Sequence, residues 1–181
     1  SKIAPVVLKT KSRIKKIHLQ PENVEPYEDV ISALGSADLI VIGPGSLYTS
    51  IIPNLLTDRV SEAVAKSKAK KMYIANVMTQ EGETDGLNIA DHVKAILNHC
   101  NDRKIVDLVI VNKEKIPDYL IQKYAKQNSE SLYLTKDQRN ELEKMKIKII
   151  EGNFLKFNGE YVRHNEEKLA KVIIDNYNYL F

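Results

Sequence analysis

An apolar run that leads directly into a glycine-containing loop constrains the fold of this chain more than any other feature. It lies within residues 37–56, ADLIVIGPGSLYTSIIPNLL. Residues 39–42 form an unbroken series of β-favouring side chains, which is typical of a strand buried on both faces of a parallel sheet. The chain is therefore expected to build a buried strand whose carboxyl end opens into a loop suited to ligand binding.

That loop has the composition of an anion-binding loop. Gly43 and Gly45 carry no Cβ atom, so peptide N–H groups on either side of Pro44 can approach a ligand closely. Hydroxyl groups add donors where a helical turn is expected to begin, at Ser46, Tyr48, Thr49 and Ser50. An ordinary strand-to-helix turn is the alternative, but such turns seldom combine so many hydroxyl groups with their glycines.

A second polar loop, NVMTQEGETDG at residues 76–86, follows a strand-like run at residues 72–75. In open α/β sheets, ligands bind at the carboxyl ends of the strands. The binding side chains expected from this loop are Asn76, Thr79, Gln80 and Thr84. Asp85 is the catalytic candidate if the protein is an enzyme, because its carboxylate could hold Mg²⁺ near phosphates or accept a proton. It could equally cap the following helix.

Strand-like and helix-like segments alternate along the whole chain, which predicts βαβ units and a mostly parallel sheet. An amphipathic helix begins near Ile89, with Asn88 and Asp91 as its polar cap, and another helix is expected to end at Gly35. The strands are expected at residues 14–19, 39–42, 72–75, 106–111, 132–134 and 147–150, and the other helices at 26–34, 58–67, 117–126, 138–145 and 166–179.

Three long motifs, GPGSLYTSIIPNLL, NVMTQEGETDGLNIADHVKAIL and YVRHN, resemble those of the YvcK-like gluconeogenesis factors (UPF0052), relatives of the archaeal CofD phospholactate transferases. The resemblance covers nearly the whole chain in the same order. It implies a Rossmann-like α/β fold with three α/β/α layers that binds a UDP-sugar such as UDP-N-acetylglucosamine. It also implies a role in cell-wall growth and cell shape under gluconeogenic conditions.

One motif of that family is absent. Its members carry a glycine-rich GGGTG-type loop after their first strand, and no segment of this chain supplies it. Residues 1–181 are therefore expected to be a single α/β domain portion that corresponds to roughly the carboxyl-terminal half of a family member. Any ligand contact made by the missing loop lies outside this chain.

Arg163 and His164 precede the final expected helix, and Asn165 is its expected N-cap. Cations are unfavourable at a helix amino terminus unless an anion joins them, and a diphosphate would do so through bidentate hydrogen bonds. A solvent-exposed arginine that points away is the alternative. Tyr124 is a further binding candidate through the family resemblance, although packing against Leu120 also accounts for it.

Composition excludes several classes of function. The 27 basic and 24 acidic residues give a net charge of +3 and are interspersed, so neither a nucleic-acid nor a membrane partner is indicated. No apolar run approaches the ~20 residues needed to cross a bilayer. Cys100 is the only cysteine, which suits a reducing cytoplasm. His92 and His99 lie too far apart on one helix, about 10.5 Å of rise, to share a metal, so no metal site is expected.

Two functions of different class remain. No serine–histidine–acid or cysteine–histidine arrangement can be defended from the sequence, which favours a UDP-sugar-binding regulatory protein over an enzyme. The alternative is a CofD-like phospholactate or nucleotidyl-type transferase that uses Mg²⁺ at Asp85, and only this alternative requires a cofactor. The oligomeric state is open, and a homo-oligomer is compatible with the sequence.

Overall fold

A sheet of four parallel strands forms the centre of the molecule, and each strand pairs with the next one along the chain. The computed structural model describes residues 12–179. The strands are β1 (Leu39–Ile42), β2 (Lys70–Ile74), β3 (Leu108–Asn112) and β4 (Lys148–Gly152). All five residues of β3 are buried, as expected for the apolar run of a central parallel strand.

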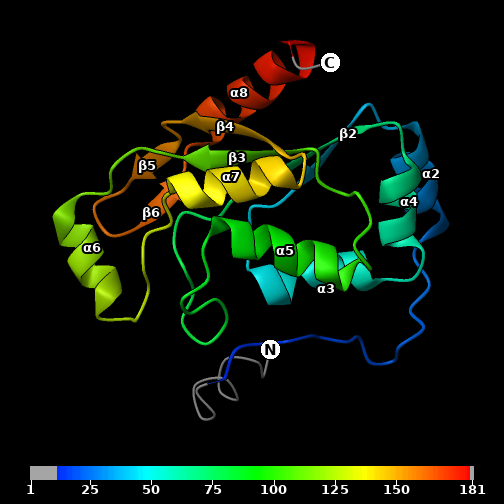
Figure 1. The fold of residues 1–181 in the computed structure, drawn as a ribbon, viewed down its shortest axis with the longest axis horizontal. Coiled ribbons are helices and arrows are strands. Elements are labelled where there is room, and N and C mark those ends of the chain that lie inside the picture. Colours follow the sequence, from blue (N-terminus) through cyan, green and yellow to red (C-terminus); the bar gives the residue numbers. More distant parts are fainter. Residues whose placement is uncertain (1–11, 180–181) are drawn as a thin grey trace.

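Helices connect the strands in the order that the sequence predicts (Figure 1). Pro53 lies in the first turn of the short helix α3, where the lack of a backbone N–H costs least. The helical elements are α2 (Glu28–Ser36), the π-helix η1 (Leu47–Ile51), α3 (Ile52–Leu56), α4 (Val60–Lys66), α5 (Ile89–His99), α6 (Asp118–Ala125), α7 (Lys136–Lys144) and α8 (Glu166–Tyr179).

Two apolar cores lie on opposite faces of the sheet, because successive strand residues point in opposite directions. Tyr73 and Val109 belong to the larger core, which α3, α4, α5 and α7 cover. Met72 and Leu108 belong to the second core, where Leu169 of α8 packs against them. Figure 1 shows α8 on one side of the sheet and α3 and α5 on the other. The expected three layers are confirmed.

An antiparallel hairpin, β5 (Leu155–Phe157) and β6 (Val162–His164), follows β4 and forms a separate sheet of two strands. The sequence did not predict it. Leu155 and Val162 of the hairpin pack with Leu120 of α6 and with Val77, which follows β2. This third apolar cluster joins the hairpin and α6 to the loop after β2.

Two expected strands are wrong. Residues 14–19 are extended but pair with no strand among the described residues, because the Ile17 N–H donates to the His99 ring instead, at 3.0 Å. Residues 132–134 also form no strand ladder: the Leu132 N–H donates to the Val77 carbonyl at 2.9 Å, next to the isolated bridge between Met78 and Ser131. Alternating apolar residues indicate an extended chain but do not identify its hydrogen-bond partner.

One helix end is also different from the prediction. Helix α2 continues through Gly35 to Ser36, and Gly35 does not adopt a positive φ, so it is not the left-handed cap that was expected.

Among residues 12–179, no helix is both long enough and apolar enough to cross a bilayer. The expectation of one α/β portion over residues 1–181 extends beyond the described residues at both ends.

Candidate functional site

A cavity of about 490 Å³ lies where the carboxyl ends of β1 and β2 face the β5–β6 hairpin and α6. Most of the binding residues expected from the sequence line it, although they come from four separate segments. They are Pro44, Gly45, Asn76, Thr79, Gln80, Tyr124, Arg163 and His164. Four further lining residues were not expected from the sequence: Val77, Met78, Ser129 and Val162.

Side-chain hydrogen bonds fix the two strand-end loops against each other. The Asn76 amide donates to the Gly45 carbonyl at 2.9 Å, and the Ser46 hydroxyl donates to Gln80 Oε1 at 2.7 Å. Within residues 12–179, no hydrogen bond uses the Asn76 Oδ1 acceptor or the Gln80 Nε2 donors, so both amides remain able to bind a ligand.

Gly43 has a structural reason to be glycine. Its φ is +84°, and a Cβ atom there would lie 3.2 Å from the Ile74 carbonyl oxygen of β2. Gly45 has no such constraint, because a Cβ atom would meet only ordinary contacts with Ser50 and Ile51 at 3.5 and 3.7 Å. The first glycine therefore serves the fold, and the second faces the cavity.

Thr79 is held by a distant segment of the chain. Its N–H donates to the Glu130 carbonyl at 2.8 Å, and its hydroxyl accepts from the Glu130 N–H at 2.8 Å. The Ser129 hydroxyl also donates to the Thr79 carbonyl. These residues are about fifty positions apart in the sequence. No local pattern could have identified Ser129 as part of the cavity wall.

The histidine of the cavity is half-buried on β6. His164 Nε2 lies 3.3 Å from the Ala75 carbonyl oxygen, so this nitrogen carries the proton. Burial lowers the pKa of His164, while the hydrogen bond to Ala75 opposes that shift. In its neutral form the ring therefore has Nδ1 as an acceptor. On α6, the Tyr124 hydroxyl accepts from the Val162 N–H at 3.1 Å and ties the helix to the hairpin.

Arg163 is exposed at the rim of the cavity and forms no ion pair among the described residues. The N-cap prediction for Asn165 is confirmed, because its side chain accepts from the Lys168 N–H at 2.9 Å. No described residue of α8 lines the cavity. The idea that Arg163 and the start of this helix share one anion stays a prediction.

The remaining expected residues lie outside this cavity. Tyr48 is buried in the core in a T-shaped contact with the His99 ring, at 5.8 Å between centroids, and Thr49 is half-buried in η1. The buried Thr84 hydroxyl accepts from the Gln80 N–H at 2.8 Å. Asp85 Oδ2 accepts from the Gly82 N–H at 2.7 Å, which makes this carboxylate a support of the loop.

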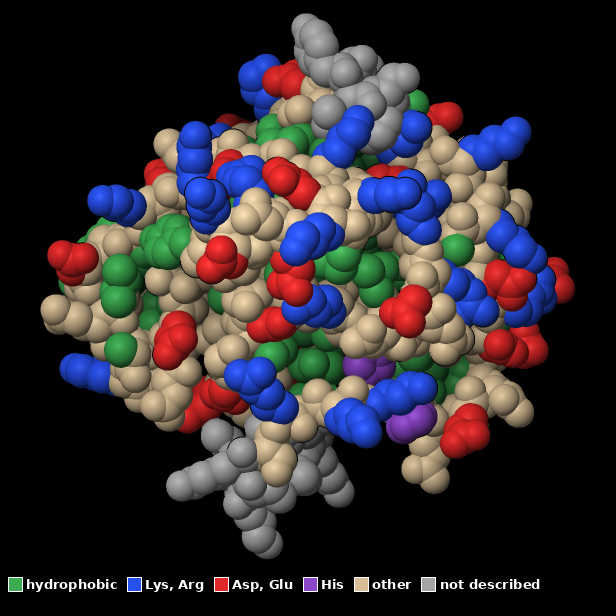
Figure 2. Space-filling view, in the orientation of Figure 1, with side chains coloured by type: hydrophobic (Ala, Val, Ile, Leu, Met, Phe, Trp, Pro, Cys, Tyr) green, Lys and Arg blue, Asp and Glu red, His purple; other side chains and the backbone are tan. Residues whose placement is uncertain are grey.

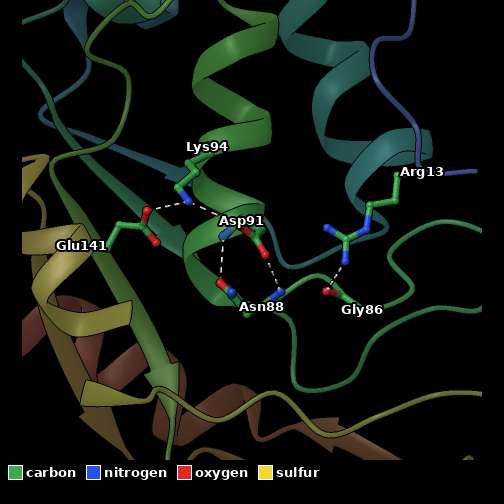
Figure 3. Close-up of polar contacts among 6 residues, drawn as sticks. All are labelled: Arg13, Gly86, Asn88, Asp91, Lys94 and Glu141. Carbon is green, nitrogen blue, oxygen red and sulfur yellow. Dashed lines mark hydrogen bonds and ion pairs between the residues drawn. The ribbon is translucent and has the colours of Figure 1, made fainter. Parts of the chain in front are cut away.

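The loop after β2 ends in a reciprocal cap on α5 (Figure 3). Asn88 Oδ1 accepts from the Asp91 N–H at 3.0 Å, and Asp91 Oδ2 accepts from the Asn88 N–H at 3.2 Å. The predicted polar cap is thereby confirmed. Lys94 joins Asp91 to Glu141 of α7, and the Arg13 guanidinium donates to the Gly86 carbonyl at 3.2 Å. The far end of the loop is thus anchored to two other segments.

No residue that lines the cavity is acidic. Its polar groups are amides, hydroxyls, one imidazole and one guanidinium, which suit a ligand that carries negative charge. Mg²⁺ prefers carboxylate oxygens, so the lining does not fit this ion. Among residues 12–179, no three His, Cys, Asp or Glu side chains come together as metal ligands.

A larger groove of about 660 Å³ lies at the outer edge of β1, between α2, α3 and α4. Gly43, Pro44 and Gly45 line its end, so it adjoins the candidate site. The rest of its lining is mainly apolar, and Ser50 is the one further residue of it that the sequence suggested as a donor. We therefore place the candidate ligand site in the smaller cavity.

A family model described as 2-phospho-L-lactate transferase CofD matches residues 2–155, which is most of the chain. The chain belongs to the CofD family.

The chain is also similar to several individual bacterial proteins. It is 42% identical over 164 residues to a putative gluconeogenesis factor of Clostridium acetobutylicum, covering 91% of this chain and 36% of that protein. It is 41% identical over 163 residues to the gluconeogenesis factor of Bacillus subtilis, covering 90% of this chain and 50% of that protein. The resemblance to this group is confirmed.

A solved structure of a UPF0052 family member from Bacillus halodurans has the same fold. It superposes with a TM-score of 0.86 at 39% sequence identity and covers 94% of this chain and 53% of the solved chain. The present chain thus spans about half the length of that protein and at most about half the length of the two gluconeogenesis factors above.

Proposed function

We propose that this chain is the ligand-binding part of a cytoplasmic regulatory protein of the gluconeogenesis-factor type. The ligand is a UDP-sugar such as UDP-N-acetylglucosamine, and the biological role is to support cell-wall growth and cell shape under gluconeogenic conditions. The names of the similar bacterial proteins support the gluconeogenic role. The nucleotide sugar is inferred from the chemistry of the cavity together with the family resemblance.

One observation carries the proposal: amide, hydroxyl and guanidinium groups converge on a cavity that has no acidic side chain. The Asn76 and Gln80 amides offer the donors and acceptors that a base or a sugar hydroxyl requires. Arg163 at the rim supplies the charge that a diphosphate requires. The volume of about 490 Å³ is within the range typical of small-molecule sites.

The transferase alternative has less support from the structure. Asp85 was the expected Mg²⁺ ligand, but it does not line the cavity, and one of its oxygens already accepts from Gly82. The family model that matches the chain is described as a transferase, so this function is tested beside the first one.

The decisive experiment titrates the protein, at its natural length, with UDP-N-acetylglucosamine by calorimetry. Uridine and N-acetylglucosamine serve as matched partial ligands, and GDP and GTP serve as control nucleotides. Saturable binding of the UDP-sugar without release of products supports a regulatory binding protein. Turnover of an activated phospholactate onto a deazaflavin acceptor, dependent on Mg²⁺, would replace our proposal with the transferase.

Substitutions of Arg163 test its contribution to ligand affinity. Lysine keeps the charge but loses the planar fork, so Arg163→Lys should recover only part of the affinity that Arg163→Ala loses. Because Arg163 is exposed, the alanine variant should lose only about 1 kcal/mol, or roughly fivefold in Kd. Circular dichroism checks that each variant is folded. Equal affinities for all three proteins would remove Arg163 from the site.

A further inference from the structure

An aromatic ring lies beside two cationic side chains at the rim of the cavity. Lys123 Nζ is 4.6 Å from the centroid of the Tyr161 ring, and Arg163 Cζ is 6.0 Å from the same centroid. Both distances are within the range of a cation–π interaction. Lys123 and Tyr161 do not line the cavity, but each directly precedes a residue that does.

Backbone contacts hold this cluster in place. Tyr161 immediately precedes β6 and Arg163 lies two positions later within it, and the 6.0 Å between the Tyr161 ring and Arg163 Cζ places both side chains on the same side of the hairpin. Lys123 Nζ donates to the Glu160 carbonyl at 2.9 Å. The neighbouring hydrogen bond from Val162 N–H to the Tyr124 hydroxyl fixes α6 against the strand. The Tyr161 ring therefore has a defined position between helix and hairpin.

The charges of the cluster are not neutralised. Lys156, the cross-strand partner of Arg163, forms an ion pair with Glu166 at 2.7 Å. Lys123 and Arg163 form no ion pair with any carboxylate of the described residues. Two cations beside one ring repel each other, and an anion between them would remove that repulsion.

We propose that Lys123, Tyr161 and Arg163 form an anion subsite at the rim of the cavity, in which Tyr161 is a positioning residue that aims the Arg163 guanidinium. The subsite binds the phosphate oxygens of a nucleoside diphosphate whose remaining part lies in the cavity. This inference rests on the proposed function for its ligand, but it is testable with a smaller anion.

The test uses inorganic pyrophosphate and UDP-N-acetylglucosamine as separate probes. Pyrophosphate is followed by NMR through the Arg163 Nε–H resonance, and the UDP-sugar is followed by calorimetry. Tyr161→Phe keeps the ring and should bind both probes like the parent protein. Tyr161→Leu and Lys123→Ala should each weaken binding by about threefold. Tyr119→Leu, an exposed tyrosine of α6, is the matched control and should change nothing.

Two readouts separate positioning from a general structural effect. Uridine lacks the phosphates, so its affinity should not change in Tyr161→Leu. The effects of Tyr161→Leu and Arg163→Ala should not add, because the ring acts through the guanidinium. Additive effects, or an equal loss of uridine affinity, would overturn the positioning role.

The outcomes also separate this inference from the proposed function. Pyrophosphate binding that depends on Tyr161, without any UDP-sugar binding, would sustain the subsite and reject the UDP-sugar. UDP-sugar binding that is equal in the parent, Tyr161→Leu and Lys123→Ala proteins would reject the subsite and sustain the proposed function. Failure of the parent protein to bind pyrophosphate would also reject the subsite.

Discussion

Gly43 and Gly45 stand two residues apart in one loop, yet the structure gives them different tasks. We expect Gly43→Ala to lower the free energy of unfolding by about 1–2 kcal/mol, because its positive φ is strained for any residue with a Cβ atom. Gly45→Ala should have little effect on stability, since its Cβ atom would meet only ordinary contacts. Urea denaturation of both variants measures the difference.

A substitution at Gly45 also tests whether the loop binds a ligand. Gly45→Val should leave the protein folded but obstruct the approach of a ligand to the backbone at the cavity. Calorimetry with UDP-N-acetylglucosamine provides the comparison with the parent protein. If the valine variant binds equally well, the loop between β1 and η1 has a purely structural role.

His92 makes the stability of the protein depend on pH. Burial lowers its pKa to about 4, and the nearby Asp91 charge opposes this only in part. The unfolded chain therefore binds a proton more readily than the folded chain between about pH 6.5 and 4. Neutral His92 makes its full contribution to the free energy of unfolding above pH 6.5. About 3 kcal/mol of this free energy is lost as the pH falls toward 4.

Urea unfolding at pH 7 and pH 4.5 measures this loss. His92→Gln retains a polar side chain that does not titrate, so the difference between the two pH values should shrink in this variant. His99 and His164 also have lowered pKa values from burial and will leave a residual dependence of the same sign. An unchanged pH dependence in His92→Gln would assign the effect to other groups.

At the level of elements, the cap of α5 connects the binding loop to the helix. Asn88→Ala removes the acceptor for the Asp91 N–H and should cost about 1 kcal/mol of unfolding free energy. Asn140→Ala, at an exposed position within α7, is the matched control and should cost nothing. Urea denaturation compares the two, and equal stabilities would show that water replaces the cap without loss.

The elements that could be predicted from the sequence are those with a strong local signal. The four apolar runs became β1–β4, and the capping pattern at Asn88 became the start of α5. The hairpin β5–β6 could not be predicted, because its strands are three residues each and depend on packing against α6. Residues 14–19 were misassigned because their contacts lie far away in the chain, as the bond from Ile17 to His99 shows.

The residues of the candidate site also fall into those that could be predicted from the sequence and those that could not. Residues beside strand ends, such as Asn76 and Gln80, could be located because the ends of parallel strands meet at one edge. Arg163 and His164 were proposed from their place just before a helix amino terminus and from the matching family motif. Ser129, Val162 and the cluster around Tyr161 could not be found, because α6 and the hairpin meet only in three dimensions.

At the scale of the whole molecule, electrostatics agree with the modest net charge. Figure 2 shows basic and acidic side chains interspersed over the visible face, without a large area of one sign. The open edge of β1 is a more distinctive surface. Within residues 12–179, β1 pairs only with β2, and Val41 at this edge is 40% exposed beside the apolar groove.

We expect this edge to associate with another polypeptide strand when residues 1–181 are produced alone. In the family that the chain resembles, first strands that this chain lacks are expected to pair with the sheet. Sedimentation of the isolated chain should show association that Val41→Lys reduces, while Ile174→Lys on α8 should not. A monomer that unfolds cooperatively, with or without the substitutions, would contradict this expectation.

The third apolar cluster, formed by the hairpin, α6 and the segment after β2, contains no residue of β1–β4. The loops that follow β1 and β2 form one wall of the cavity, while the hairpin and α6 form the opposite one. Substitutions in this wall can therefore accumulate during evolution without disturbing the two cores of the sheet. Proteins that inherit the same sheet are thereby free to diverge in ligand preference, and the wall built on α6 and the hairpin is where such divergence should be sought.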